Sequence, residues 1–169
     1  TSIIITIVNT LPEAEMRTIL LAPTGRAAKV LNNYTNREAS TIHRKIYQIK
    51  TSKKGDFSIL MKENKHTNTL FIVDEASMIS TLDNDGAATL FGERNLLSDL
   101  FEFVKSGKNC FLMFVGDTAQ LPPVKQTVSP GLDADYLQRN FDVEIIQNEL
   151  KEVVRQQQAS GILLNATAL

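Results

Sequence analysis

The stretch TLFIVDE at residues 69–75 joins an apolar run to two adjacent carboxylates. Its first five residues are β-branched, aliphatic or aromatic without polar alternation, which is typical of a strand buried on both faces. Residues 18–22 and 111–115 have the same character. Helical patterns separate these three runs, so we expect an α/β domain with a mostly parallel sheet and helices on both faces.

Helices are expected over five segments, namely residues 2–10, 26–32, 41–46, 96–104 and 133–140. The first of these is ambiguous, because its isoleucines favour a strand by propensity. Its polar positions recur every three to four residues, however, and this spacing favours a helix that ends before Pro12. A fourth strand is expected at Val143–Ile146.

A small β-hairpin is expected within residues 47–66, inserted into a single domain that spans residues 1–169. Tyr47, Ile49 and Thr51 alternate with polar residues. The segment 52–56 has the composition of a turn, and residues 57–61 return as a second strand.

Composition limits the cellular compartment of the protein and the way in which it could bind nucleic acid. The formal net charge is −1, so DNA binding would depend on local placement of donors and not on a global basic field. Cys110 is the single cysteine, which rules out a disulfide within the chain and fits a reducing cytosol. No apolar stretch reaches the roughly 20 residues that span a bilayer. We therefore expect a cytoplasmic protein without a membrane partner.

Two acidic residues follow the second apolar run, and polar groups follow the third. In parallel sheets, ligands bind beyond the carboxyl ends of the strands. There Asp74 could hold Mg²⁺ and Glu75 could face a hydrolytic water, or both could belong to a solvated loop start. Asp117 and Gln120 would reach the same edge, where the amide suits a γ-phosphate sensor. The alternative for this second segment is a proline-rich turn without function.

Two further segments could contact a polyanion. In LAPTGRAAKVL at residues 21–31, a strand runs through a turn into a helix start, where Thr24, Arg26 and Lys29 could form an anion site. In STIHR at residues 40–44, Thr41 and His43 could contact a phosphate or stack on a base. The alternatives are a βα turn with solvated basic residues and a histidine that only lies on the surface.

The order of these motifs resembles that of superfamily-one, RecD-type (RecD/TraA-like) DNA helicases. LAPTGRAAK resembles their motif Ia, STIHR the next DNA-contacting motif, FIVDEASM motif II and GDTAQLPPV motif III, and EVVRQ at residues 152–156 resembles motif IV. The resemblance covers essentially the whole chain. It implies the first RecA-like motor domain of a P-loop NTPase.

The resemblance implies a role for each matching residue. Asp74 would bind Mg²⁺, Glu75 would polarise the hydrolytic water, Gln120 would read the γ-phosphate, and Arg155 would stabilise transition-state charge. Asp117 would join the nucleotide site. The single-strand channel would be lined by Pro23, Thr24, Gly25, Arg26, Lys29, Thr41 and His43. The hairpin would match a strand-separating pin.

For the parent protein, the resemblance implies ATP-dependent 5′-to-3′ translocation on single-stranded DNA and duplex unwinding. The resemblance also extends to a RecD-like subunit of an exonuclease-V-type enzyme, with nuclease or recombination partners. ATP and Mg²⁺ would be its cofactors. The first alternative is a non-catalytic nucleic-acid-binding accessory module, and the second is another P-loop ATPase such as a nucleotide-gated switch.

One family element does not occur in the 169 residues, namely the phosphate-binding loop G-x-x-x-x-G-K-[ST]. Gly107-Lys108 is followed by Asn109, after a helical pattern. We expect Thr1 to be the last residue of such a loop and a second Mg²⁺ ligand, and the chain by itself to show no ATPase activity. The expected strand Val143–Ile146 would then lack its neighbouring strand. We expect one of three outcomes: the strand pairs elsewhere in the sheet, another chain fills the gap, or the domain is only marginally stable.

Overall fold

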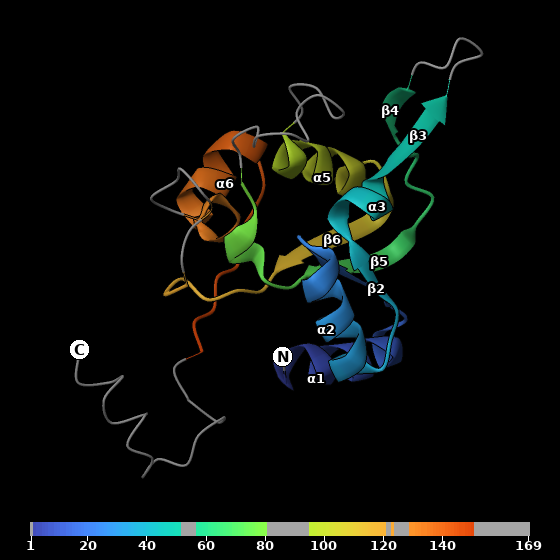
Figure 1. The fold of residues 1–169 in the computed structure, drawn as a ribbon. Helices are drawn as coiled ribbons and strands as arrows, with labels where there is room; N and C mark the ends of the chain where they lie inside the picture. Colours follow the sequence, from blue (N-terminus) through green and yellow to red (C-terminus); the bar gives the residue numbers. More distant parts are fainter. Residues whose placement is uncertain (1, 52–56, 81–94, 121–122, 124–128, 151–169) are drawn as a thin grey trace.

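The computed structural model describes residues 2–51, 57–80, 95–120, 123 and 129–150 (Figure 1). Its main sheet has the strand order β2-β1-β5-β6, and each neighbouring pair is parallel. The strands are β1 Arg17–Ala22, β2 Ala39–Thr41, β5 Thr67–Val73 and β6 Lys108–Phe114. This is the parallel α/β arrangement expected for a RecA-like domain.

Helices cover both faces of this sheet, as the unbroken apolar character of its strands predicts. Helices α1 Ser2–Thr10 and α2 Gly25–Thr35 lie on one face, below the sheet in Figure 1. Their core contains Ile4, Val8, Leu31 and two strand residues, Leu20 and Ile72. The spacing of polar residues therefore gave the correct structure for the first segment.

The opposite face is covered by α3 Ile42–Ile46, α5 Leu96–Lys105 and α6 Ala134–Phe141. Strand residues that alternate with those of the first core, namely Leu21, Phe71 and Val73, enter this second core. Phe71 makes an edge-to-face contact with Phe103 of α5, with ring centroids 5.9 Å apart. The two cores hold the central strand β5 from both sides.

The predicted hairpin forms from β3 Tyr47–Thr51 and β4 Phe57–Met61, paired antiparallel from Tyr47↔Met61 to Thr51↔Phe57. The expected turn at residues 52–56 lies outside the described residues. At the base, the Tyr47 hydroxyl donates to the Asp99 carboxylate of α5 over 2.6 Å. Figure 1 shows the two strands projecting from the body of the domain.

The predicted strand at Val143–Ile146 is wrong, because residues 143–150 have no regular secondary structure. A strand requires hydrogen bonds to a neighbour, and within the described residues β6 pairs with β5 alone. Val143 and Ile145 pack against the second core, whereas Ile146 is 84% exposed. Side-chain packing thus holds this segment without hydrogen bonds to a neighbouring strand. None of the described residues forms the strand pairing that was expected for Val143–Ile146.

No helix among the described residues is both long and apolar enough to cross a lipid bilayer.

Candidate functional site

The register of the sheet brings the carboxyl ends of its four strands to one edge. Ala22 of β1 pairs with Thr41 of β2, and Leu21 pairs with Val73 of β5. Val73 in turn pairs with Phe114 of β6. The segments that follow these strands are therefore neighbours, and they contain most of the residues singled out in the sequence.

The acidic pair leaves β5 at this edge. The Asp74 amide donates to the Leu21 carbonyl oxygen over 2.9 Å, and both carboxylate residues are half-buried. Glu75 has the left-handed backbone angles φ 54° and ψ 39° and precedes the short 3-10 helix η2 Ala76–Met78. A side chain in this region strains the backbone by about 1–2 kcal/mol, and such strain often occurs at functional sites.

The loop after β6 packs directly on the segment after the acidic pair. The Ala76 amide donates to the Val115 carbonyl oxygen over 2.9 Å. The buried Ser77 hydroxyl donates to the Gln120 side-chain oxygen over 3.3 Å. A Cβ on Gly116 would lie 3.2 Å from the Ser77 amide nitrogen, so only glycine fits this close approach comfortably. The structure thus brings the acidic segment and Gln120 together.

Asp117 shapes the turn that presents Gln120. Its carboxylate accepts a hydrogen bond from the Ala119 amide over 2.9 Å, and its carbonyl oxygen accepts one from the Gln120 amide over 3.2 Å. Both Asp117 and Gln120 are exposed. The geometry therefore gives Asp117 a role in positioning Gln120, whereas its contact with a nucleotide stays a prediction.

A third segment supports the acidic turn, and the sequence analysis missed it. The 3-10 helix η3 Pro130–Leu132 packs against η2, and Pro130 and Gly131 are buried. A Cβ on Gly131 would lie 2.8 Å from the carbonyl oxygen of Ala76. The proline-glycine pair was the available signal, but only the fold shows which backbone it approaches.

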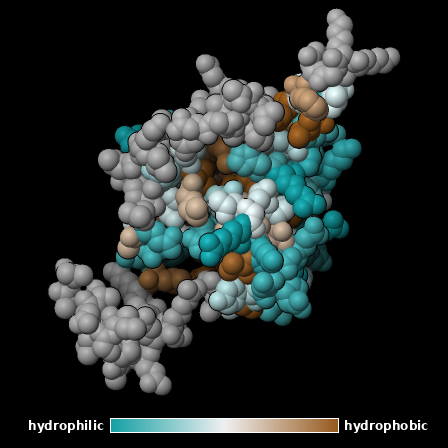
Figure 2. Space-filling view, in the orientation of Figure 1, coloured by the Kyte–Doolittle hydropathy of each residue, from teal (hydrophilic) through white to brown (hydrophobic). Residues whose placement is uncertain are grey.

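The expected DNA-contacting residues lie at the β1 and β2 end of the same edge. The Thr24 hydroxyl accepts a hydrogen bond from the Ala27 amide and caps α2, and the Thr41 hydroxyl accepts one from the Arg44 amide and caps α3. Pro23 is half-buried, and the exposed residues here are Gly25, Arg26 and Lys29. Hydrophilic residues gather over α2 and α3 in Figure 2.

His43 differs from a simple cationic contact. Burial lowers the pKa of the His43 imidazole, so the ring is mainly neutral at pH 7. Its centroid lies 5.8 Å from that of Tyr47, at an interplanar angle of 52°. His43 therefore adds a neutral aromatic ring to this edge, and Arg26 and Lys29 provide the positive charge.

Two of the predicted site residues, Thr1 and Arg155, lie outside the described residues, so their roles stay predictions. Among the described residues, no group of three or more His, Cys, Asp or Glu side chains could hold a metal ion. Mg²⁺ commonly takes one or two carboxylates and completes its shell with phosphate oxygens and water. Asp74 could supply such a carboxylate.

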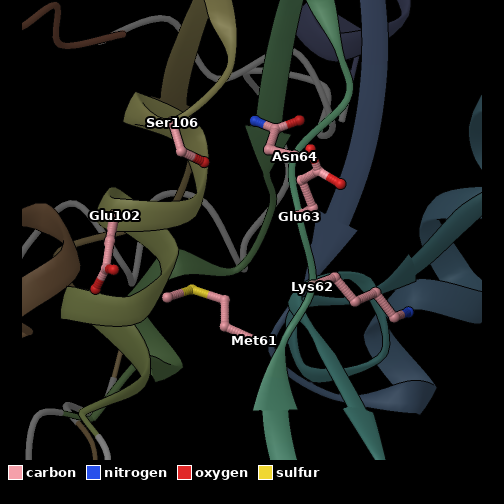
Figure 3. Close-up of a pocket in the computed structure, with 6 residues that line it drawn as sticks. All are labelled: Met61, Lys62, Glu63, Asn64, Glu102 and Ser106. Atoms are coloured by element: carbon pink, nitrogen blue, oxygen red, sulfur yellow. The ribbon is translucent and has the colours of Figure 1, made fainter.

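The candidate site is an open edge of the sheet, and a separate cavity lies elsewhere among the described residues. A cavity of about 390 Å³ lies between α5 and the segment that leads into β5, at the opposite end of that strand (Figure 3). Its lining comprises Met61, Lys62, Glu63, Asn64, Glu102 and Ser106. Buried Asn64 is satisfied there, because its amide donates to Phe103 and accepts from the His66 amide.

Comparisons with known proteins agree with the α/β fold. An AAA domain family matches residues 1–126, a range that contains the four sheet strands, the acidic pair and Gln120. An uncharacterised protein of Methanocaldococcus jannaschii is 33% identical over 114 residues, which cover 62% of this chain. The chain spans 9% of the length of that relative.

Proposed function

The chain belongs to this P-loop, helicase-related AAA domain family, and from that premise we propose that it is the motor domain of an ATP-dependent, RecD-type DNA helicase. The observation that carries the proposal is the contact between Ser77 and Gln120. It links the segment that would bind the metal and activate water to the segment that would sense the γ-phosphate.

In this proposal the chain's carboxylates have separate tasks. Asp74, directly after β5, would hold Mg²⁺, which would supply charge neutralisation for the phosphates of ATP. Glu75, one residue further along, orients and deprotonates the attacking water. Thr1 and Arg155 would add a second metal ligand and a cation for transition-state charge, respectively.

Gln120 transmits the state of the nucleotide in this proposal. Its side chain contacts Ser77, and its loop follows the strand beside β5. A change at the γ-phosphate would therefore move the segments that border the strand ends, including the turn after β1. That turn leads into α2, whose first turn contains Arg26, so the hydrolysis site and the DNA site would share one edge of the sheet.

Single-stranded DNA is the proposed polymer, bound by Pro23, Thr24, Gly25, Arg26, Lys29, Thr41 and His43. Exposed cations and an aromatic ring at one edge fit a channel that follows the backbone and stacks bases. Translocation from 5′ to 3′, separation of strands by the β3–β4 hairpin, and association with nuclease or recombination subunits belong to the same proposal.

Replacing Arg26 by alanine should weaken single-stranded DNA binding without a change in fold, because Arg26 is exposed on the first turn of α2. Loss of one phosphate contact should make the plot of log affinity against log salt shallower by about 0.7. Fluorescence anisotropy with a labelled oligonucleotide measures this slope.

Arg139→Ala is the matched control, since Arg139 is exposed on α6 and its Nε donates to the Asp135 carbonyl oxygen of the same helix. We expect the slope for this variant to equal that of the parent chain. Equal slopes for Arg26→Ala and the parent would count against the DNA site at α2.

The second candidate is a non-catalytic nucleic-acid-binding module with the same fold. Under this alternative the Arg26→Ala result would be unchanged, but the full-length protein would hydrolyse no ATP.

A further inference from the structure

A second cavity, of about 300 Å³, opens beside the short edge strand β2. Its lining comprises Thr18, Ile19, Leu20, Arg37, Glu38, Ser40 and Lys45. The pairing of β1 with β2 begins only at Leu20↔Ala39. Thr18 and Ile19 therefore extend beyond the start of β2, and the cavity occupies the notch that the short strand leaves. We name it the Lys45 cavity.

Positive charge gathers around this cavity. Burial, and then the charge of Lys62, lower the pKa of Lys45, while Glu38 acts in the opposite direction. Burial, and then the charges of Lys45 and Arg17, lower the pKa of His66. The charge of Lys62 thus acts on Lys45, those of Lys45 and Arg17 act on His66, and Glu38 is the carboxylate that offsets Lys45.

These charges are not neutralised by close ion pairs in the described part of the chain. The salt bridge recorded there joins Lys65 to Glu63 over 3.5 Å, and both of its side chains are largely exposed. The Lys62 ammonium donates to the Arg44 carbonyl oxygen over 2.6 Å, which fixes it beside α3. The partly buried Lys45 ammonium has no such close ion pair among the described residues, and a bound anion would stabilise it.

The lining also supplies neutral donors. Ser40 makes only a long hydrogen bond of 3.4 Å to the Thr41 carbonyl oxygen, so its hydroxyl can turn to a ligand. Thr18 is a second hydroxyl-bearing residue of the lining. Lysine and arginine together with hydroxyl donors are the groups that proteins use to hold backbone phosphates. The chemistry of the Lys45 cavity therefore suits a phosphate.

The lining of the larger cavity, of about 390 Å³, differs in charge from that of the Lys45 cavity. Two of its lining residues are Glu63 and Glu102, and Figure 3 shows Lys62 extending away from it toward α3. That cavity would repel a phosphate, whereas the Lys45 cavity would attract one.

The Lys45 cavity continues the proposed DNA path. Ser40 directly precedes Thr41, and Lys45 follows His43 by two residues on α3. The lining residue Ser40 therefore lies one strand residue, about 3.3 Å, before the carboxyl edge. We propose that the Lys45 cavity binds a backbone phosphate of the single strand that crosses Thr41 and His43. This inference rests on the proposed function.

Lys45→Gln tests the inference, because it removes the charge and keeps most of the side chain. Removing a repelled, partly buried cation should leave the free energy of unfolding unchanged or raise it. Affinity for single-stranded DNA should fall by about three- to tenfold, and the salt slope should become shallower by about 0.7. Urea denaturation and fluorescence anisotropy measure the two effects. Lys65→Gln is the control and should alter neither quantity, since Lys65 is exposed and paired with Glu63.

The outcomes separate this inference from the function on which it rests. An unchanged slope for Lys45→Gln together with a shallower slope for Arg26→Ala overturns the Lys45 cavity as a phosphate site and leaves the helicase proposal intact. Absence of single-stranded DNA binding by the parent chain overturns both. Inorganic phosphate is the last probe. If it shifts the NMR signals of Ser40 and Lys45 while an oligonucleotide does not, the cavity binds free phosphate, and the proposal that it binds a phosphate of the DNA backbone is wrong.

Discussion

Replacing Glu75 by glutamine in the full-length protein is expected to lower kcat for ATP hydrolysis by about 10²–10⁴-fold while nucleotide binding persists. The substitution keeps the shape of the side chain and removes its ability to accept a proton. Glu75 follows the central strand directly and is held in a left-handed conformation by the surrounding segments. The loss should therefore appear in kcat, measured by steady-state phosphate release, and not in KM.

Glu102→Gln is the matched control, since Glu102 is exposed on α5 and lines the cavity at the opposite end of β5. This variant should retain the parent kcat. A Glu75→Gln protein that hydrolyses ATP within about twofold of the parent rate would exclude Glu75 as the general base, since general-base catalysis contributes at least about 10²-fold.

Gly131→Ala is expected to lower the free energy of unfolding by about 1–3 kcal/mol, because the added methyl group overfills a closed contact. The new Cβ would lie 2.8 Å from the Ala76 carbonyl oxygen, which belongs to the backbone and cannot rotate away. Relieving this steric clash requires η3 to move away from η2, which is the turn that follows Glu75. Urea denaturation measures the change in stability.

Gly25→Ala adds the same methyl group at the start of α2, where nothing lies within 4 Å of the new Cβ. Stability should stay the same or rise by up to about 1 kcal/mol, because alanine has the better helix propensity. A Gly131→Ala chain as stable as the Gly25→Ala chain would show that the contact between η3 and η2 does not hold the acidic turn.

Much of the fold could be predicted from local sequence. The alternation of Phe71, Ile72 and Val73 between two cores follows from an apolar strand without polar positions. The same reasoning places Asp74 at the carboxyl edge of the sheet, since parallel strands end together. It also brings Gln120 to that edge, and the structure adds the contact with Ser77 that joins them.

Features that depend on distant parts of the chain could not be predicted. Strand β2 has only three residues, and it forms because β1 offers an open edge. Val143–Ile146 has the composition of a strand but forms no ladder with the described residues. The hydrogen bond from Tyr47 to Asp99 joins residues far apart in sequence, so no local pattern indicates it.

The coupling between the nucleotide and DNA sites is the central claim, and one measurement tests it most directly. The affinity of the full-length protein for single-stranded DNA should be determined with and without a non-hydrolysable ATP analogue and Mg²⁺. We predict a change of about 5–150-fold, the usual range for coupled sites, and its loss in Gln120→Ala. Equal affinities with and without the bound analogue in the parent protein would contradict the account.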